Sequence, residues 1–398
     1  MFKKKLKVSH IILAAALVLS VAGMVIYGYR LVRSDRATEE AAPPAKTAYA
    51  APEPSQPSPS PKPSEPALPS ASPSAGPAAA PEDSGPTYVV ENERFGIDNA
   101  GGNARATTDG INAALEWAKA EGYKTVAFQP GTYMIQCTWD NRFGAPTDGI
   151  LVPSGITLDL AGATFVMEPN SNPQYALFAV VKQSDVVIKN GTLVGDRDLH
   201  AYAPSKDSPT HEYGFGICIS DSNNVLIQDV VIKDMTGDGI IIEGSYFMRD
   251  NGDNVSRGIR IIGCNISNCR RQGISVVAAK DSEIANNEIY GISGTAPQYG
   301  IMMMLQLDYV IDNLKIHDNI IYDCAGGAIA CNSGTGCEIY SNTVSGNILV
   351  VHASDIKIYD NTIQNSYIEV MPGASGITVT DNILEGNSWI KAAETPSG

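Results

Sequence analysis

Side chains able to do acid–base chemistry gather at three points of the sequence, each just before a short apolar run. The stretches are His211-Glu212-Tyr213, Asp238 and Arg270-Arg271-Gln272. Elimination from an acidic sugar needs a cation for its carboxylate, a base and an acid, which an arginine, Tyr213 and His211 could supply. Hydrolysis of a glycoside needs two carboxyl groups, for which Glu212 and Asp238 are the candidates. These residue types therefore favour cleavage of a sugar polymer.

We predict two groups of site residues from this clustering. The catalytic group is Asp238, Glu212, His211, Tyr213 and Arg271. The group predicted to bind substrate is Arg270, Gln272, Tyr299, Arg197 and Asp196. The last two lie in a long polar insertion, 195–212, that enters beside the same stretches.

Each candidate also has a purely structural interpretation. Asp238 stands in Thr-Gly-Asp-Gly, where an aspartate commonly forms a turn. Arg270 and Arg271 could pair with surface acids, and His211 and Glu212 could simply close the long insertion. Convergence of all of them on one edge is what favours a site.

The sequence between these stretches repeats itself, which is how they could come together. The repeats include LKIHDNIIYDC (314–324), CEIYSNTVSGN (337–347), IKIYDNTIQNS (356–366) and ITVTDNILEGN (377–387). Their fourth core position is an asparagine, at 287, 319, 342, 361 and 382. Short alternating strands at a period near 20 predict a solenoid whose asparagines hydrogen-bond from coil to coil.

A second strand recurs in each coil and predicts the faces. Aligned on their glycines, these strands read YGFGICIS, DGIIIEGS, QGISVVAA and YGIMMMLQ. Alternation predicts that the third and fifth columns point inward, from Phe215 and Ile217 to Ile368 and Val370. The glycine column is predicted to face outward and leave a shallow furrow. Tyr213, Asp238, Gln272 and Tyr299 then share one column, with coils about 4.8 Å apart.

The stretch before the coils predicts a cap. Residues 106–122, ATTDGINAALEWAKAEG, carry apolar residues at helical spacing and Gly122 as a stop. A helix here would cover one open end of the solenoid.

Residues 95–135, FGIDNAGGNARATTDGINAALEWAKAEGYKTVAFQPGTYMI, together with the coils, resemble the pectate-lyase-like right-handed parallel β-helix superfamily. Its N-terminal signature has an aromatic-Gly-x-Asp start, a Thr/Ser-Asp-x-Ile helix and a Pro-Gly-Thr-Tyr strand. The resemblance covers residues 88–398. It implies an all-β, right-handed parallel β-helix and an activity among those of pectate lyases, polygalacturonases, alginate epimerases and tailspike glycosidases, or none.

Motifs of individual families match poorly. Of the three polygalacturonase motifs, only Asp238 keeps a catalytic carboxylate, because Tyr213 and Gln272 replace the family's Asp and His. The epimerase motif Tyr-Gly-Phe-Asp-Pro-His is matched only by Tyr213-Gly214-Phe215. Calcium-dependent lyases use clustered acids, whereas Asp238, Glu243 and Glu369 are scattered, so we predict no cofactor and keep Ca²⁺ as an alternative.

Charge and cysteine content narrow the class of protein. Residues 1–86 hold 9 of the 28 basic and 7 of the 43 acidic residues, which leaves 87–398 a net charge of −17. That excludes a nucleic-acid partner, which would require a basic surface. The seven cysteines contain no Cys-x-x-Cys and are predicted to be buried thiols.

The N-terminal part predicts export. Residues 11–29 carry no charge and follow a lysine-rich tip, which predicts a transmembrane signal anchor within 1–36, with a cleaved signal as the alternative. Residues 37–86 form a linker rich in Pro, Ser and Ala, since 14 of the 24 prolines lie in 41–86. Residues 87–398 form the β-helix domain.

Taken together, the sequence predicts a polysaccharide lyase or glycoside hydrolase held at the extracellular face of a membrane. The alternative is a non-catalytic glycan-binding or adhesive β-helix protein, which could also be secreted. The uncapped last coil leaves an edge where a partner could bind, and the oligomeric state stays open.

Overall fold

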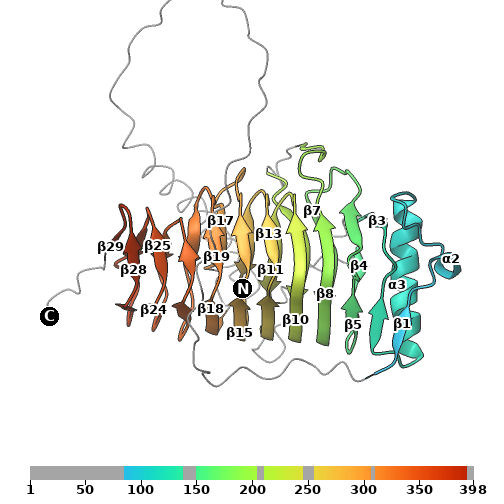
Figure 1. Cartoon of the computed structure of the whole chain (residues 1–398), viewed down its shortest axis with the longest axis horizontal. Helices are drawn as coiled ribbons and strands as arrows, with labels where there is room; N and C mark the ends of the chain where they lie inside the picture. Colours follow the sequence, from blue (N-terminus) through green and yellow to red (C-terminus); the bar gives the residue numbers. More distant parts are fainter. Residues whose placement is uncertain (1–84, 138–148, 204–209, 245–254, 306–309, 392–398) are drawn as a thin grey trace, which may run out of the picture. The chain divides into compact units, whose positions relative to one another are not determined.

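The computed structural model describes residues 85–137, 149–203, 210–244, 255–305 and 310–391 (Figure 1). Its strands form two stacks that run the length of the domain, every pairing being parallel. The predicted all-β parallel β-helix is confirmed.

The larger stack, sheet A, contains two rows of strands. The first row is β1 (Thr87–Val89), β2 (Thr125–Ala127), β5 (Thr157–Asp159), β8 (Ser184–Val194), β10 (Asn223–Lys233), β12 (Ser256–Ile262), β15 (Ala279–Ala285), β18 (Ile311–His317), β21 (Glu338–Tyr340), β24 (Lys357–Tyr359) and β27 (Thr378–Thr380). The second row is β3 (Thr132–Ile135), β6 (Thr164–Met167), β13 (Asn265–Ser267), β16 (Glu288–Tyr290), β19 (Ile320–Tyr322), β22 (Thr343–Val344), β25 (Thr362–Gln364) and β28 (Ile383–Glu385). The long strands β8 and β10 run through both rows.

The smaller stack, sheet B, holds one strand from each coil. Its strands are β4 (Ile150–Leu151), β7 (Gln174–Val181), β9 (Tyr213–Ser220), β11 (Asp238–Glu243), β14 (Gln272–Val276), β17 (Tyr299–Met303), β20 (Gly327–Cys331), β23 (Ile348–Val350), β26 (Tyr367–Val370) and β29 (Trp389–Lys391). Consecutive coils pair in order, so each residue lies beside its equivalent one coil away.

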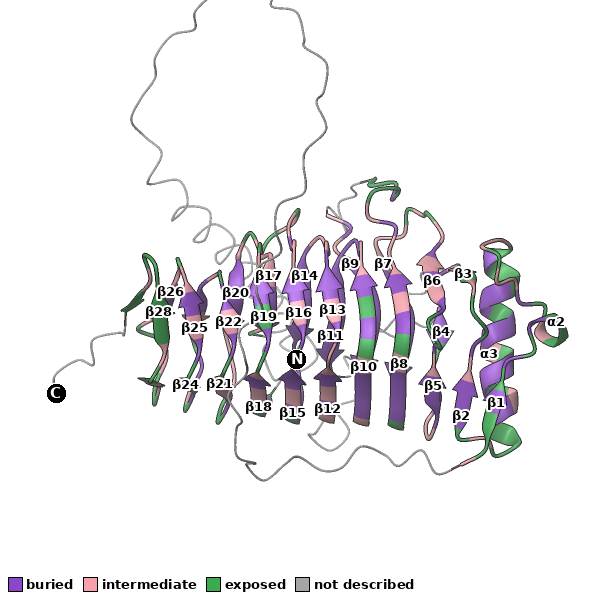
Figure 2. Cartoon of the chain, in the orientation of Figure 1, coloured by how far each residue is buried: buried purple, intermediate pink, exposed green. Residues whose placement is uncertain are grey.

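Stacked β-branched side chains fill the interior. In sheet B, Ile217, Ile240, Ile274 and Ile301 are paired in register and fully buried. Each such side chain contributes roughly 1.5–3 kcal/mol by leaving water. Figure 2 shows this burial through the middle coils, whereas β28 at the C-terminal end is exposed.

The predicted asparagine ladder is confirmed. Asn287 Nδ2 donates to Asn319 Oδ1 at 2.9 Å, and Asn342 and Asn361 continue the chain at the same distance to Asn382. Each acceptor amide oxygen also takes the backbone N–H of the previous asparagine at 3.0 Å. The buried bend therefore satisfies its own polar groups.

A second column of bends lies on sheet A, and we call it the left-handed column. Its members all have φ between 50° and 65°: Asp185, Asn224, Gly258, Asp281, Asn313, Gly336, Asp355 and Gly376. Asp, Asn and Gly adopt this conformation at the lowest cost. Asp185, Asp281 and Asp355 are therefore turn residues of this column.

The predicted cap is present as helix α3 (Ala104–Ala120), after a single-turn helix, α2 (Asn92–Phe95). The buried face of α3 includes Ile111, Ala114, Leu115 and Ala118, which pack into the end of the main core. Gly122, with φ of 84°, ends the helix as expected.

Two predicted alignments in sheet B are wrong. Ile217, not Phe215, pairs with Ile240, because the glycine equivalent to Gly239 is Gly216, the second glycine of YGFG. In a later coil, Ile348 and Val350 are the core residues in place of Leu349 and Val351. In that coil Asn347, not a glycine, stands at the column position, so no glycine there marks the register.

The glycine column does not form an outward furrow, which corrects a second expectation. A Cβ at Gly239 would lie 2.5 Å from Cγ2 of Ile266, and one at Gly273 would lie 2.5 Å from Cγ2 of Ile289. These positions face inward. Glycine is needed there because the opposite wall of the solenoid lies too close for a side chain.

Residues 1–84 lie outside the described residues, so the anchor at 11–29 and the linker at 37–86 remain predictions. Within the described ranges, no helix has the length and apolar character needed to cross a bilayer. All seven cysteines are described. They form no disulfide within the described ranges, and all but Cys324 are buried, as predicted.

Candidate active site

The first residues of β11 and β14 bring the central candidates together. Asp238 pairs with Gln272, and Arg271 immediately precedes Gln272. Two residues further on, Ile274 pairs with Ile301, so Gln272 and Tyr299 stand in equivalent positions. By the same pairing, Phe215 and not Tyr213 lies opposite Asp238, so the predicted column of four is correct for three.

Arg271 joins two carboxylates from different coils. Its Nη1 donates to Asp238 Oδ2 at 2.9 Å, and its Nε lies 3.8 Å from Glu212 Oε1. Asp238 is fully buried, whereas the side chain of Glu212 is 18% exposed. One guanidinium therefore holds an inner and an outer carboxyl group.

Asp238 is only half satisfied. Its Oδ2 also accepts from Ser275 Oγ at 2.7 Å, whereas its buried Oδ1 has no hydrogen-bond partner among the described residues. Burial raises the pKa of this carboxyl, although Arg271 and Ser275 act in the opposite direction. Asp238 therefore holds a proton more readily than an exposed aspartate does.

Ser275 points to the same conclusion by hydrogen count. Its Oγ lies 2.7 Å from Asp238 Oδ2 and 2.6 Å from Gln272 Oε1, but a hydroxyl donates one hydrogen. Gln272 is oriented with Nε2 donating to Met302 Sδ at 3.2 Å. With this orientation, the chain is complete when Asp238 carries a hydrogen and donates it to Ser275.

His211 and Asp196 lie in a separate buried cluster. Asp196 Oδ2 contacts His200 Nδ1 at 2.8 Å, His200 Nε2 contacts His211 Nδ1 at 3.0 Å, and His211 Nε2 contacts the Ala203 carbonyl at 2.9 Å. Tyr175 donates to the other oxygen of Asp196 at 2.6 Å. We call this set the Asp196–His200–His211 relay.

The relay corrects two assignments. His211 is 4% exposed, and both its ring nitrogens are engaged, so it is not available to act on a substrate. Asp196 is buried in the same contacts and does not face a furrow. Both residues hold the long insertion closed in this structure, which for His211 is the alternative that the sequence offered.

The remaining cations and tyrosines disperse around this centre. Arg270 Nη1 donates to the Thr210 carbonyl at 2.7 Å and its guanidinium covers the Tyr202 ring at 4.6 Å. Arg197 donates to Asn268 at 2.8 Å. These two arginines therefore hold loops in place, and their role in substrate binding stays a prediction.

Tyr213 and Tyr299 differ in access. Tyr213 is 43% exposed, with the Arg271 guanidinium 5.8 Å from its ring centroid. Tyr299 is half-buried, and burial raises its pKa while Asn347 hydrogen-bonds it. Of the two, Tyr213 offers the ring that a sugar could pack against.

Two features of the site escaped sequence reasoning. One is Ser275. Gly273 and Ile274 both face inward, so strict alternation counted forward from Gln272 would place Ser275 on the inner face. Counting back from the buried Val276 places Ser275 on the outer face, where the structure has it. Glu243, at the end of β11, was noted only as a scattered acid. Burial raises its pKa to about 8, and Cys218 Sγ lies 3.7 Å from its Oε1.

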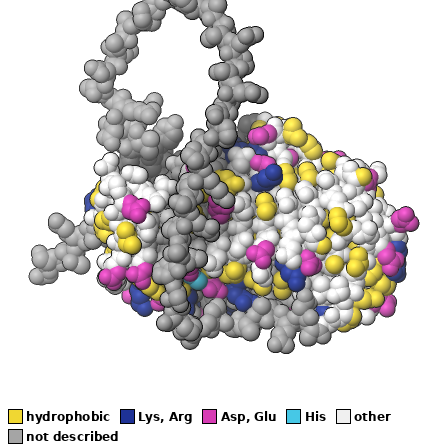
Figure 3. All heavy atoms as spheres, viewed as in Figure 1, with side chains coloured by type: hydrophobic (Ala, Val, Ile, Leu, Met, Phe, Trp, Pro, Cys, Tyr) yellow, Lys and Arg dark blue, Asp and Glu magenta, His cyan; other side chains and the backbone are white. Residues whose placement is uncertain are grey.

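No three acidic, His or Cys side chains of the described ranges converge as metal ligands would. Across the visible face in Figure 3, basic and acidic side chains are interspersed among neutral ones.

Comparison with known proteins gives the same architecture. A family model described as a right handed beta helix region matches residues 206–363 and 254–395. The chain is 29% identical over 323 residues to the uncharacterized protein YclG of Bacillus subtilis (strain 168), covering 75% of this chain and 54% of that protein. The prophage-derived uncharacterized protein YorA of the same strain is 28% identical, covering 75% and 55%. The chain thus spans about half the length of the curated relatives it matches.

Solved structures resemble the chain in fold. The A-module of mannuronan C-5 epimerase AlgE4 from Azotobacter vinelandii has a TM-score of 0.50 at 15% identity, covering 76% of this chain and 99% of that one. The tailspike protein of E. coli bacteriophage HK620, in complex with a pentasaccharide, has a TM-score of 0.55 at 10% identity, covering 75% and 62%. The hand of the solenoid predicted from the sequence is confirmed.

Proposed function

We propose that this right-handed parallel β-helix protein is a polysaccharide-active enzyme, a glycoside hydrolase centred on Asp238 and Glu212. The observation that carries the proposal is the state of Asp238: buried, with a raised pKa and one unpartnered carboxyl oxygen. A carboxyl group that keeps its proton can act as a general acid. The similarity to saccharide-acting β-helix proteins supports a carbohydrate ligand as an analogy of fold.

The proposed reaction uses the two carboxyl groups in different states. When a substrate binds, the Asp238 proton exchanges from Oδ2, beside Ser275, to Oδ1, and Ser275 then donates to Oδ2. Oδ1 gives the proton to the glycosidic oxygen as the bond from that oxygen to the anomeric carbon breaks. In the direct route, water adds to the anomeric carbon and Glu212 takes up the proton that the water loses. In the route through a glycosyl ester, Glu212 first bonds to the anomeric carbon; water then displaces Glu212, and the ionised Asp238 takes up the proton that the water loses. Arg271 stays charged throughout, with Glu212 as its negative partner when Asp238 is protonated.

Hydrolysis is better supported than elimination. A lyase would need a free cation for the uronate carboxylate, but Arg271 is committed to Asp238 and Arg270 to the Thr210 carbonyl. His211, the proposed acid of such a reaction, is committed to the relay. The carboxyl pair is the arrangement that remains available.

Access to Asp238 sets a condition on this proposal. Its carboxyl group is fully buried, so a glycosidic oxygen reaches Oδ1 only if side chains above it move. Glu212 and Tyr213 are the more exposed neighbours on that side. The same burial favours the second candidate function, a non-catalytic glycan-binding protein in which the ion pair is purely structural.

A panel of polysaccharides separates the candidates. We expect the full chain to release reducing ends from at least one neutral or acidic polymer, with Asp238→Asn and Glu212→Gln inactive. Asp355→Asn is the matched control, since Asn already occupies equivalent positions of the left-handed column at 224 and 313. If the product instead absorbs as an unsaturated sugar, the reaction is elimination and the proposal of hydrolysis is wrong. Binding without any product would leave the glycan-binding function.

We also infer that the protein is exported and anchored, with residues 11–29 in the membrane and 37–86 as an extracellular linker. The uncharged run after a lysine-rich tip supports this placement. Membranes washed with alkaline carbonate should retain the full chain, and external protease should release the β-helix domain. If a shortened chain is instead recovered from the medium, residues 11–29 act as a cleaved signal and the anchor is wrong.

A further inference from the structure

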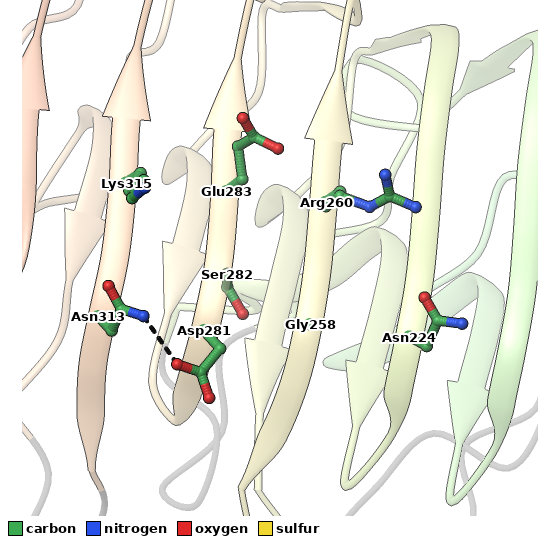
Figure 4. Close-up of a pocket in the computed structure, with 8 residues that line it drawn as sticks. All are labelled: Asn224, Gly258, Arg260, Asp281, Ser282, Glu283, Asn313 and Lys315. Carbon is green, nitrogen blue, oxygen red and sulfur yellow. Dashed lines mark hydrogen bonds between the residues drawn. The ribbon is translucent and has the colours of Figure 1, made fainter. Parts of the chain in front are cut away.

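A groove on the outer face of sheet A lies apart from the carboxyl pair. It has a volume of about 330 Å³ and is lined by side chains from four consecutive coils, on β10, β12, β15 and β18. Figure 4 shows its two rows. The upper row is Arg260, Glu283 and Lys315, and the lower row is Asn224, Gly258, Asp281 and Asn313.

The hollow exists because Gly258 breaks the left-handed column. The neighbouring members, Asn224 and Asp281, both carry a polar side chain over the sheet. A Cβ at Gly258 would meet nothing closer than the Asn224 backbone nitrogen at 3.7 Å. The missing side chain therefore opens a space bounded by amides and charges.

The charges around this space alternate. Arg260 pairs in register with Glu283, and Glu283 with Lys315, so the three stand one coil apart. Glu283 is fixed from the side by His317 Nε2 at 2.9 Å. An acid thus lies between two cations along the length of the groove.

Lys315 has no acid of its own within the part of the chain that the structure describes. The next acid in its row, Glu338, uses one oxygen for Lys357 Nζ and the other for Tyr359 OH, each at 3.0 Å. Glu283 is held by His317. The Lys315 ammonium is therefore available to a ligand.

From this arrangement we propose that the groove is a second saccharide-binding site, specific for an uncharged oligosaccharide. A strong anion is opposed by Asp281 and Glu283, and a cation is opposed by Arg260 and Lys315. A sugar hydroxyl satisfies both kinds of group, since it accepts from a cation and donates to a carboxylate. The site holds a glycan and does no chemistry on it, and it does not depend on the proposed hydrolase.

The test fills the groove without disturbing the fold. Gly258→Asn introduces the residue already found at 224 and 313 in the same conformation. Gly336→Asn makes the same change in the same column, two coils beyond Asp281 and outside the groove. Both variants are made in the full chain carrying Asp238→Asn, which prevents turnover.

Calorimetric titration uses cellohexaose, xylohexaose and mannohexaose as neutral probes and hexagalacturonate as an anionic one. We expect a neutral hexaose to bind, binding to be lost in Gly258→Asn and unchanged in Gly336→Asn, and Lys315→Ala to weaken it about tenfold. The proposal is overturned if no neutral hexaose binds, if Gly258→Asn binds as the parent does, or if hexagalacturonate is the ligand that Gly258→Asn loses.

A separate measurement keeps this site distinct from the carboxyl pair. With Asp238 intact, Gly258→Asn should cleave polymer at the rate of the unaltered chain. Loss of cleavage in this variant with Gly336→Asn unaffected would contradict the independence of the two sites.

Discussion

Arg271 Nη1 donates to Asp238 Oδ2 at 2.9 Å, yet Asp238 Oδ1, on the same buried carboxyl group, has no hydrogen-bond partner among the described residues. A purely structural ion pair would be expected to use both oxygens, because a buried unpaired polar atom costs about 1–3 kcal/mol. The open oxygen is therefore the part of the pair that a substrate could complete.

Removing Arg271 should destabilise the fold. Arg271→Met leaves two carboxyl groups without their cation, one of them fully buried, and losing one partner of a buried pair costs about 3–5 kcal/mol. Urea unfolding of the full chain measures the change. Adding Asp238→Asn should recover a large share of the loss, because no buried acid then remains unpaired. Additive losses in the double variant would contradict this coupling.

Glu243 should make stability depend on pH. Burial raises its pKa to about 8 from the ordinary value of 4.5, so between these values the folded state holds a proton that the unfolded state has released. The free energy of unfolding therefore falls as pH rises through this window, by up to about 1.4 kcal/mol per pH unit. Glu243→Gln should remove this slope and be the more stable protein at pH 8. Parallel profiles for the two proteins would show that Glu243 is ionised in the fold.

The asparagine ladder should tolerate change at its end better than in its middle. Asn342→Ala removes the acceptor for the Asn319 backbone and side-chain amides and the donor to Asn361, all buried. We expect a loss of more than 2 kcal/mol, on the order of two unmade buried hydrogen bonds. Asn382→Ala is the control, since that residue is half-buried and closes the described ladder. Equal losses in thermal unfolding would argue against a chain of dependent bonds.

His200 should hold the loop beside the site. His200→Phe keeps a ring of similar shape but leaves the buried Asp196 Oδ2 without its imidazole partner. We expect faster backbone hydrogen exchange in 196–203 and 210–213, with little change in the coils beyond residue 310. Asp196→Asn in addition should restore part of the protection. Unchanged exchange in the single variant would mean that the relay does not fix this loop.

Sequence pattern was sufficient for the solenoid, the asparagine ladder and the α3 cap because each depends on residues repeated at a fixed spacing. The pattern also predicted that Asp238 lies beside Gln272 and Arg271. Gly239 directly follows Asp238 and Gly273 directly follows Gln272, so aligning the two glycines fixes the register. The coil containing Tyr213 has glycines at 214 and 216, and pattern alone could not tell which of them meets the close opposite wall.

Side-chain direction at the bends was beyond the pattern. His211 has a left-handed backbone, with φ of 47°, which turns its ring into the relay and away from Glu212 and Arg271. Arg270 and Arg271 are adjacent, yet one reaches a loop carbonyl and the other a buried carboxylate. Such choices depend on what the intervening loops bring, for which no periodicity exists.

The row Arg260, Glu283, Lys315, Glu338 and Lys357 places opposite charges on adjacent coils. Deleting the single coil of Lys315 would bring Glu283 against Glu338, whereas deleting two consecutive coils would bring Glu283 against Lys357. Like charges directly opposite one another destabilise a sheet. Along this row, therefore, only the deletion of an even number of coils keeps opposite charges on neighbouring strands, so the number of coils has a parity.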